Sequence, residues 1–410
     1  MGEFYFMAPK VITGKSQDSG ISSFLLILMS IASGVTVANL YYSQPLLEEL
    51  SRFFHVSPAM VGISAMLIQI GYALGLLLLV PLGDIKEQRS LIMVMLGCSL
   101  LALIGVSFAS NIGWLMAGSL LVGITSIVPQ LVVPLAAHMA RPEARGKVIG
   151  SVMSGLLIGI LLSRTFSGVV GSTLGWRAVY RLAALMMAFI LGAFYLWLPK
   201  TTPDSIMKYG ELLKSLVKLF RTQAVLREAS LVGAMMFATF SVFWTTLSFL
   251  LKSPVYHFGA EVAGLFGLVG VAGALAASVV GRVTDRKNPR FTLTIAITFS
   301  ALSYLCFWIF GYRMWGLVLG VILLDLGIQS GQISNQARIY MLDSSAHNRN
   351  NAVYMVSYFC GGAIGSLLGP FCWWNFGWTG VCALGMIFQM IAATVHILGA
   401  KSSTVRGLQN

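Results

Sequence analysis

Long apolar stretches of membrane-spanning length recur along the chain and constrain its fold more than any other feature. They form two sets of six, at 22–44, 59–82, 90–109, 113–138, 147–171 and 178–198, and at 229–251, 261–284, 290–311, 314–338, 350–374 and 378–399. A bilayer crossing takes about 20 apolar residues, and within lipid such a segment satisfies its backbone hydrogen bonds as a helix. The pattern predicts an all-α polytopic membrane protein with twelve transmembrane helices.

The composition excludes the other common classes of protein. Of the 410 residues, 57% are hydrophobic and 10% are charged, whereas a soluble domain carries about 25% charged residues. Intrinsic disorder needs low hydrophobicity. Neither a soluble domain nor a disordered chain therefore fits.

The distribution of Lys and Arg predicts how the chain is oriented. If both termini are cytoplasmic, 21 of the 27 basic residues fall on the cytoplasmic side. Arg164 lies inside a span, and the opposite side holds Arg52, Arg177, Arg181, Lys252 and Arg313. Cytoplasmic loops collect positive charge. We therefore expect a multi-pass inner-membrane protein with both ends inside, and the net charge of +13 needs no nucleic-acid partner.

The spans divide the chain into five parts. These are an N-terminal cytoplasmic segment (1–21, whose first six residues are expected to be a cloning remnant), a six-helix bundle (22–198), a linker (199–228), a second bundle (229–400) and a tail (401–410). No cleaved signal peptide is expected. The linker contains an amphipathic pattern that suits either a helix on an anionic membrane surface or a solvated linker helix.

The two sets of six helices repeat at a nearly fixed offset. Asp84 and Asp285 are 201 residues apart, the Gly-Trp pairs that begin at 175 and 377 are 202 apart, and Arg145 and Arg349 are 204 apart. Duplicated units related by an axis along the membrane normal are typical of one large class of secondary transporters.

The loops after the second and eighth spans carry a more specific signal. Gly281-Arg-Val-Thr-Asp285-Arg286 resembles the signature loop of the major facilitator superfamily, and the first copy retains Asp84 and Arg89. NLYYSQPLL (39–47), GILLSRTFSGVVG (159–171) and SNQARIYML (334–342) resemble its drug:proton antiporter and sugar-efflux branch. The resemblance implies two pseudo-symmetric bundles, with helices 1, 4, 7 and 10 lining a central cavity.

Two charged residues lie well inside predicted spans, Arg164 and Asp325. Asp325 begins a polar stripe with Gln329, Gln332 and Gln336, which share one helical face. Buried charge is costly in a bilayer and marks function. We expect the stripe to line the cavity, or else to bond to neighbouring helices. Asp325 is the first candidate for proton coupling with Arg164 as its cation, while a purely structural ion pair is the alternative.

Polar and aromatic residues on the other cavity helices are further candidates for contact with the substrate. These are Asn39, Tyr41, Tyr42 and Gln44 near the end of the first span, Gln130 in the fourth, and Trp244 and Thr245 in the seventh. Tyr41 and Tyr42 suit either an organic substrate or an interfacial anchor.

The signature loops are expected to act as cytoplasmic gates. The resemblance implies that Asp84 faces the positive N-terminus of the eleventh helix. Arg89, Arg145 and Arg338 are the expected neighbours, and Asp285 and Arg286 are the equivalent residues of the second copy.

Enzymatic and ATP-driven mechanisms find no support in the sequence. Gly14-Lys15-Ser16 lacks the rest of a phosphate-binding loop, the five cysteines form no CxxC pair, and no catalytic constellation occurs. We expect no cofactor beyond the proton gradient, and a monomer suffices. The leading hypothesis is alternating-access, proton-coupled efflux of a small organic compound. An importer of a metabolite or metal chelate, and a transporter-like receptor or sensor, are the alternatives.

Overall fold

The computed structural model describes residues 20–200, 209–284, 289–342 and 347–407. Within these ranges all the regular structure is helical, which confirms the all-α polytopic prediction. Nine helices of the described residues are long and apolar enough to cross a membrane, and α1 and the start of α11 are shorter apolar helices. The number of crossings itself stays a prediction.

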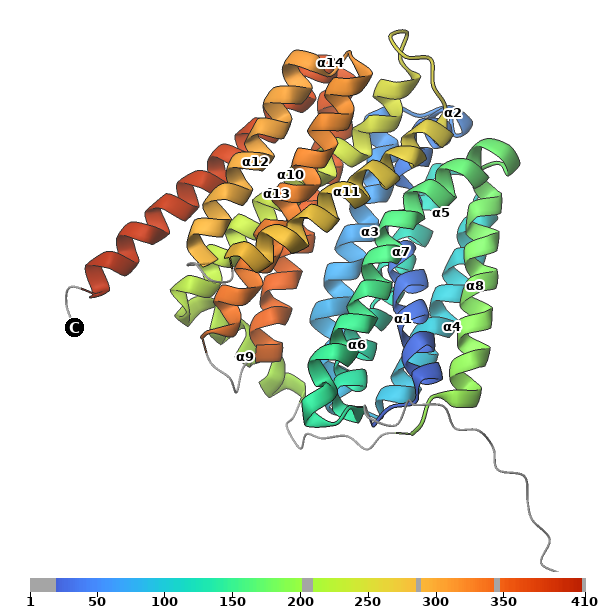
Figure 1. The fold of residues 1–410 in the computed structure, drawn as a ribbon. Helices are drawn as coiled ribbons and strands as arrows, with labels where there is room; N and C mark the ends of the chain where they lie inside the picture. The colour runs from blue at the N-terminus through green and yellow to red at the C-terminus, as the bar shows by residue number, and fades with distance from the viewer. Residues whose placement is uncertain (1–19, 201–208, 285–288, 343–346, 408–410) are drawn as a thin grey trace, which may run out of the picture.

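The first half of the chain forms the helices coloured blue to green in Figure 1. They are α1 (Ser23–Ala38), α2 (Leu47–Phe53), α3 (Pro58–Leu78), α4 (Gln88–Ser107), α5 (Ile112–Thr125), α6 (Val128–Met139), α7 (Arg145–Leu174) and α8 (Trp176–Trp197). Three 3₁₀ turns join them, η1 (Gln44–Leu46), η2 (Val80–Asp84) and η3 (Pro142–Ala144).

The second half forms the yellow to red helices on the other side of the same view (Figure 1). They are α10 (Ala224–Lys252), α11 (Ala260–Thr284), α12 (Pro289–Phe310), α13 (Met314–Tyr340) and α14 (His347–Gly407). A short helix, α9 (Tyr209–Thr222), precedes α10. We call the end of the molecule that carries α9 the α9 end, and the opposite end the α2 end.

Four predicted spans differ from the helices observed. The span 113–138 is two helices, α5 and α6, because Pro129 lies in the first turn of α6 and has no N–H to continue the hydrogen bonding of α5. The spans 350–374 and 378–399 lie in one element, α14, which breaks at Gly377 (φ 62°, ψ −157°). That backbone conformation is open to glycine alone.

The first predicted span, 22–44, also ends earlier as a helix, at Ala38. Beyond it the chain winds more tightly, with the Tyr41 N–H donating to the Ala38 carbonyl at 3.0 Å and the Leu46 N–H to that of Ser43 at 3.0 Å. These are three-residue rather than four-residue steps. Pro45 lies in the first turn of η1, where a missing N–H costs nothing.

The internal repeat extends to details of backbone conformation. His55 (φ 53°) and His257 (φ 55°) are the non-glycine residues with positive φ in the described chain, and they are 202 positions apart. The Arg89 side chain donates to the Tyr195 carbonyl at 2.7 Å. At a separation of 201, Arg290 donates in the same way to His396 at 2.9 Å. The predicted duplication accounts for these coincidences.

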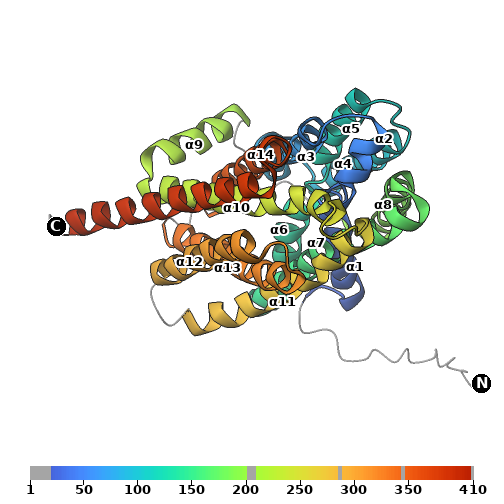
Figure 2. The ribbon, with the colours of Figure 1, turned by 90° about the horizontal axis from the view of Figure 1, so that it is seen from above.

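The two halves meet along two pairs of helices, α3 with α14 and α7 with α11, as Figure 2 shows from above. Gly62 lies against Pro370, and Gly168 lies against Gly264. The Thr165 hydroxyl donates to the Gly264 carbonyl at 2.9 Å. All of these residues lie in the part of their helices nearer to the α2 end. The structure therefore has the halves tightly closed at that end.

The distribution of side chains matches a lipid environment. Large apolar side chains such as Leu101, Phe189 and Trp374 are exposed on the outside, whereas Arg164, Asp325 and Gln389 are buried. A soluble protein rarely exposes continuous apolar surface of this kind. The outer surface is therefore apolar, and these polar side chains lie inside.

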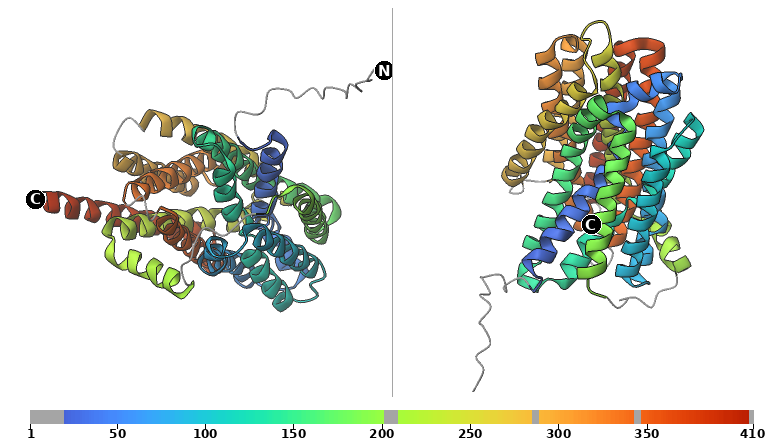
Figure 3. Two further views of the ribbon diagram at one scale, coloured as in Figure 1. Left: turned by 90° about the horizontal axis from the view of Figure 1, so that it is seen from below. Right: turned by 90° about the vertical axis from the view of Figure 1, so that its right-hand side faces the viewer.

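Helix α9 packs against the outside of α10 and α14 at its end of the molecule (Figure 3). Leu212 and Leu216 are buried on one of its faces, and Lys218 on another face is exposed. The Tyr209 hydroxyl donates to the Leu78 carbonyl at 2.7 Å, which ties this helix to the first half. The membrane-surface and solvated-linker interpretations of this helix both stay predictions.

Within the first half, α1 and α7 approach closely at glycines, which provides a test of the packing. A Cβ at Gly159 would collide with the Gly34 backbone, whereas a Cβ at Gly150 on the same helix would meet nothing within 4 Å. We expect Gly159→Ala to destabilise the purified protein by about 1–3 kcal/mol, because overpacking forces the helices apart.

The matched control, Gly150→Ala, should be neutral or stabilising by up to about 1 kcal/mol, since alanine favours helix. Thermal unfolding in detergent measures both variants. Equal stability of the two would contradict the close α1–α7 contact.

Candidate functional site

Arg164 lies at the boundary between the two halves and is completely buried. It projects from α7, and its Nε donates to Gln44 Oε1 at 2.8 Å. Gln44 is the first residue of η1, so the tight turns after α1 place its amide beside the guanidinium. The Nη2 atom has no hydrogen-bond partner among the described residues.

Aromatic rings surround the same guanidinium. Its central carbon lies 4.0 Å from the ring centroid of Trp244, 4.8 Å from that of Tyr41 and 5.2 Å from that of Phe240. A cation over an aromatic face is attracted by the ring quadrupole. Trp244 and Phe240 belong to α10 of the second half, so these contacts join the halves.

Asp325 lies on α13 and is also buried, with 1% of its surface exposed. Its Oδ2 atom has no hydrogen-bond partner in the described chain. A Cβ at Gly267 of α11 would touch Arg164, and one at Gly270 would touch Asp325. Since these glycines are one helical turn apart, the base of the Arg164 side chain and the Asp325 carboxylate pack against the same stretch of α11, and the two charges interact electrostatically.

The two charged groups do not form a direct ion pair. No ion pair within 4.0 Å joins Arg164 and Asp325 among those of the described residues. In this conformation the guanidinium instead bonds to a neutral amide. The predicted pairing of these residues thus stays a prediction about another state, although both lie in one buried region.

The predicted glutamine stripe leads from Asp325 toward the α9 end. Gln329, Gln332 and Gln336 are all half-buried, in contrast to Asp325. Gln336 donates to Asn351 Oδ1 at 3.4 Å. The three glutamines are therefore less buried than Asp325, which lies nearer to the closed end.

The other predicted cavity residues separate into two groups. Tyr41, Gln44 and Trp244 gather around Arg164. The remaining residues make contacts elsewhere: Asn39 with Ser99 and Ser126, Tyr42 with Phe166, Gln130 with Tyr72, and Thr245 with the Ser241 carbonyl. Asn39 thereby ties α1 to α4 and to the α5–α6 junction.

Phe240 and an aromatic stack beside it are missing from the sequence-based prediction. Phe237 stacks on Tyr358 at 4.1 Å between ring centroids, with 15° between the planes, and lies 5.6 Å from Phe240. Phe237, Phe240 and Trp244 recur at helical spacing along α10. That spacing was the signal available in the sequence, because it places all three rings on one face.

The predicted gate residues lie in different surroundings. The Asp84 side chain and all of Asp285 and Arg286 are outside the described residues. Arg89 bonds to the Tyr195 carbonyl within the first half, and Arg145 is exposed.

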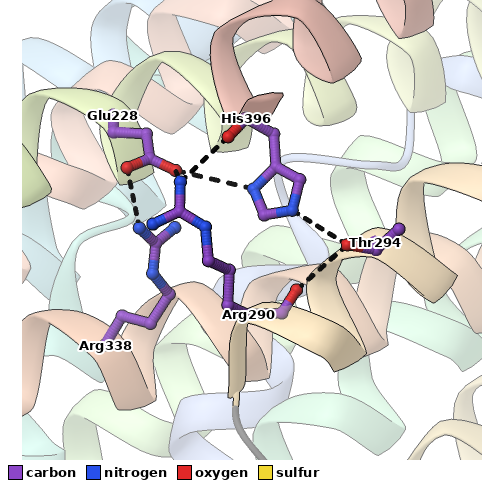
Figure 4. Close-up of polar contacts among 5 residues, drawn as sticks. All are labelled: Glu228, Arg290, Thr294, Arg338 and His396. Atoms are coloured by element: carbon purple, nitrogen blue, oxygen red, sulfur yellow. Dashed lines mark hydrogen bonds and ion pairs between the residues drawn. The ribbon is translucent and has the colours of Figure 1, made fainter. Parts of the chain in front are cut away.

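Arg338 belongs to a buried ionic cluster at the α9 end of the second half (Figure 4). Glu228 of α10 is its centre, with Oε2 at 2.8 Å from Arg338 and Oε1 at 3.0 Å from Arg290. His396 Nδ1 lies 3.5 Å from the same carboxylate, and its other ring nitrogen lies 2.9 Å from Thr294. The cluster joins α10, α12, α13 and α14.

The predicted linker, 199–228, includes Glu228 because the predicted apolar span begins at the next residue. The structure starts α10 at Ala224, so Glu228 lies a full turn inside the helix and is 8% exposed. A carboxylate there is tolerated because it is paired on both oxygens.

A hollow of about 950 Å³ lies at the α2 end, lined by residues of both halves. Glu48, Glu49 and Arg52 come from α2, and Phe249 and Trp374 from the second half. Burial raises the pKa of Glu49, an effect that the Trp176 N–H opposes by donating to this carboxylate. The hollow places acidic groups where the closed halves meet the outside.

Comparison with known proteins places this arrangement in context. The family model described as Major Facilitator Superfamily matches residues 24–370. The putative uncharacterized transporter YgaY of Escherichia coli (strain K12) is 40% identical over 371 residues, 90% of this chain and 94% of the relative. A probable sugar efflux transporter of Pasteurella multocida (strain Pm70) is 27% identical over 232 residues, 56% of this chain and 55% of the relative.

A solved structure shares the fold. It is a bacterial homolog to the human lysosomal transporter Spinster, in an inward-facing and unoccupied conformation. It superposes with a TM-score of 0.71 at 13% identity, covering 92% of this chain and 97% of the other.

The ionic cluster of Figure 4 generates a stability prediction. Glu228→Gln removes the carboxylate that neutralises Arg338, whose side chain is 8% exposed. Breaking a buried pair in this way costs about 3–5 kcal/mol, so we expect a clearly lower unfolding temperature in detergent.

The control is Arg52→Gln, which removes the exposed 3.8 Å pair with Glu48. It should cost less than about 1 kcal/mol, because water screens such pairs. If Glu228→Gln were as stable as this control, the cluster would not hold the four helices together.

Proposed function

Because the chain belongs to the major facilitator superfamily, we propose that it is a proton-coupled secondary transporter that exports a small organic compound. The buried carboxylate of Asp325, unpaired and facing the same stretch of α11 as Arg164, is the observation that carries the proposal. Burying a charged side chain within a membrane costs free energy, so a charged residue at such a position marks a functional site. The relative named a sugar efflux transporter supports the outward direction.

In the proposed cycle the two halves rock around this centre. The closed α2 end, with Gly168 against Gly264, and the half-buried glutamines toward the α9 end support a cycle in which this state takes up substrate from the α9 end. We assign this end to the cytoplasm of a bacterial inner membrane, since basic residues concentrate there. The partners are then lipid, protons and the substrate, and one chain supplies both halves.

Protonation of Asp325 is the proposed coupling step. A neutral carboxyl group costs less to bury than a carboxylate and loses its attraction to Arg164. The halves can then exchange one closed arrangement for the other. Asp325 carries no net charge while it holds the proton during this step, and loss of the proton on the side opposite to its uptake restores the carboxylate and completes the exchange.

The test is proton movement in proteoliposomes that hold the purified protein and a pH-sensitive dye. A panel of cationic, neutral and anionic organic compounds is added to the wild type and to Asp325→Asn. We expect at least one compound to drive proton flux in the wild type and none to do so in the variant, which retains only exchange of substrate.

The matched control is Glu211→Gln, which changes a carboxyl to an amide on the exposed side of α9 and should leave the flux intact. The sign of the flux separates export from import. Concentration of substrate against its gradient by Asp325→Asn would contradict the coupling role. Binding without any flux in the wild type would favour a receptor.

A further inference from the structure

We propose that Arg164 is the recognition group for an organic anion, a carboxylate attached to a flat apolar body, and that this is the substrate class of the transporter. The inference rests on the proposed function, since it names what the same site binds. The evidence is that Arg164 contacts a neutral amide and three aromatic rings but forms no ion pair with a carboxylate among the described residues.

The charge balance around Arg164 is incomplete. A buried cation normally has a carboxylate close by, because burying an unpaired charge is costly. At the α9 end the rule holds, since Glu228 pairs with Arg338 and Arg290. Arg164 is 0% exposed, yet its one bonded partner in the described chain is the neutral amide of Gln44.

The edge of the guanidinium keeps a donor that no described residue uses. Rings of Trp244, Tyr41 and Phe240 lie 4.0–5.2 Å from its central carbon, while Nη2 has no acceptor. Trp244 Nε1 is a second buried donor without a partner. Two unpaired donors beside a planar cation suit a carboxylate, which accepts two hydrogen bonds from a guanidinium edge.

The surroundings of these donors suit a flat apolar body. From Trp244 the aromatic face of α10 continues through Phe240, 5.9 Å away between centroids, to Phe237 and the stacked Tyr358. Offset aromatic contacts favour a planar ligand. The row runs toward the α9 end, from which the proposed cycle takes up substrate.

Asp325 competes with such a ligand. An anion at Arg164 would lie near the Asp325 carboxylate, which interacts electrostatically with Arg164, and like charges disfavour each other in a low-dielectric interior. The anion and the Asp325 carboxylate therefore compete for the one buried cation. The sign of the proton flux that the anion drives decides whether anion and proton move in opposite directions or together.

Binding by the purified protein in detergent tests this inference separately from transport. The probes are 2-naphthoate and its uncharged isostere 2-naphthamide, with isothermal titration calorimetry as the readout. We expect the wild type to prefer the carboxylate by about tenfold or more, the ratio that one charge-assisted hydrogen bond supplies. Arg164→Gln should abolish the preference, and Asp325→Asn should strengthen binding of the carboxylate.

A second variant protects the test against misfolding of Arg164→Gln. Trp244→Phe keeps a ring over the guanidinium and removes the Nε1 donor, so it should weaken the carboxylate severalfold with little effect on the amide. Equal affinity for both probes, preference for the amide, or binding of neither would overturn the inference. Carboxylate binding without proton flux would instead overturn only the coupled export.

Discussion

A bilayer offers no hydrogen bonds to peptide groups, and every later feature of this protein depends on that constraint. It forces the apolar chain into helices. Apolar side chains such as Leu101, Phe189 and Trp374 are exposed on the outside of these helices, and polar groups such as Arg164 and Asp325 are buried inside. The helices then pack through glycines as well as through buried apolar side chains. Pairs such as Gly34 with Gly159 within the first half and Gly168 with Gly264 between halves set how closely the backbones approach.

Buried charge has two different environments in this framework. Around Glu228 the carboxylate pairs with two guanidinium groups and lies beside a histidine, and these contacts join four helices of one half. Arg164 and Asp325, at the boundary between halves, form no ion pair within 4.0 Å among the described residues. Paired charges hold a bundle together, whereas unpaired charges have partners still to gain. For this reason we propose that Arg164 and Asp325 at the boundary take part in transport, and that the Glu228 cluster at the α9 end stabilises the second half.

Much of the fold follows from local sequence properties. Span length and the 201-residue offset predict the helices and the duplication, because both depend on patterns near in sequence or repeated in it. The two positive-φ histidines and the Arg89 and Arg290 contacts show how deep the repeat reaches. Hydropathy averaged over a window does not predict the break at Pro129 or the start of α10 at Ala224. Single residues determine where a helix begins or breaks, and averaging over a window hides their effect.

The candidate site was predictable in part. The cost of charge in lipid identifies Arg164 and Asp325 from sequence alone. Their partners do not follow from it, because Gln44, Phe240 and Trp244 come from two other helices, and which faces meet depends on the packing of both halves. For the same reason the sequence does not predict that Arg338 bonds to Glu228 of α10.

The central claim is that the charge at Asp325 controls which end of the molecule is closed. Spin-label distances test it directly, with labels at Leu174 and Val255 for the α2 end, and at Lys147 and Phe291 for the α9 end, all exposed positions. The background replaces the five native cysteines. We predict that Asp325→Asn shifts the two distance distributions in opposite directions relative to the aspartate form. Unchanged distributions, or shifts of the same sign at both ends, would contradict the claim.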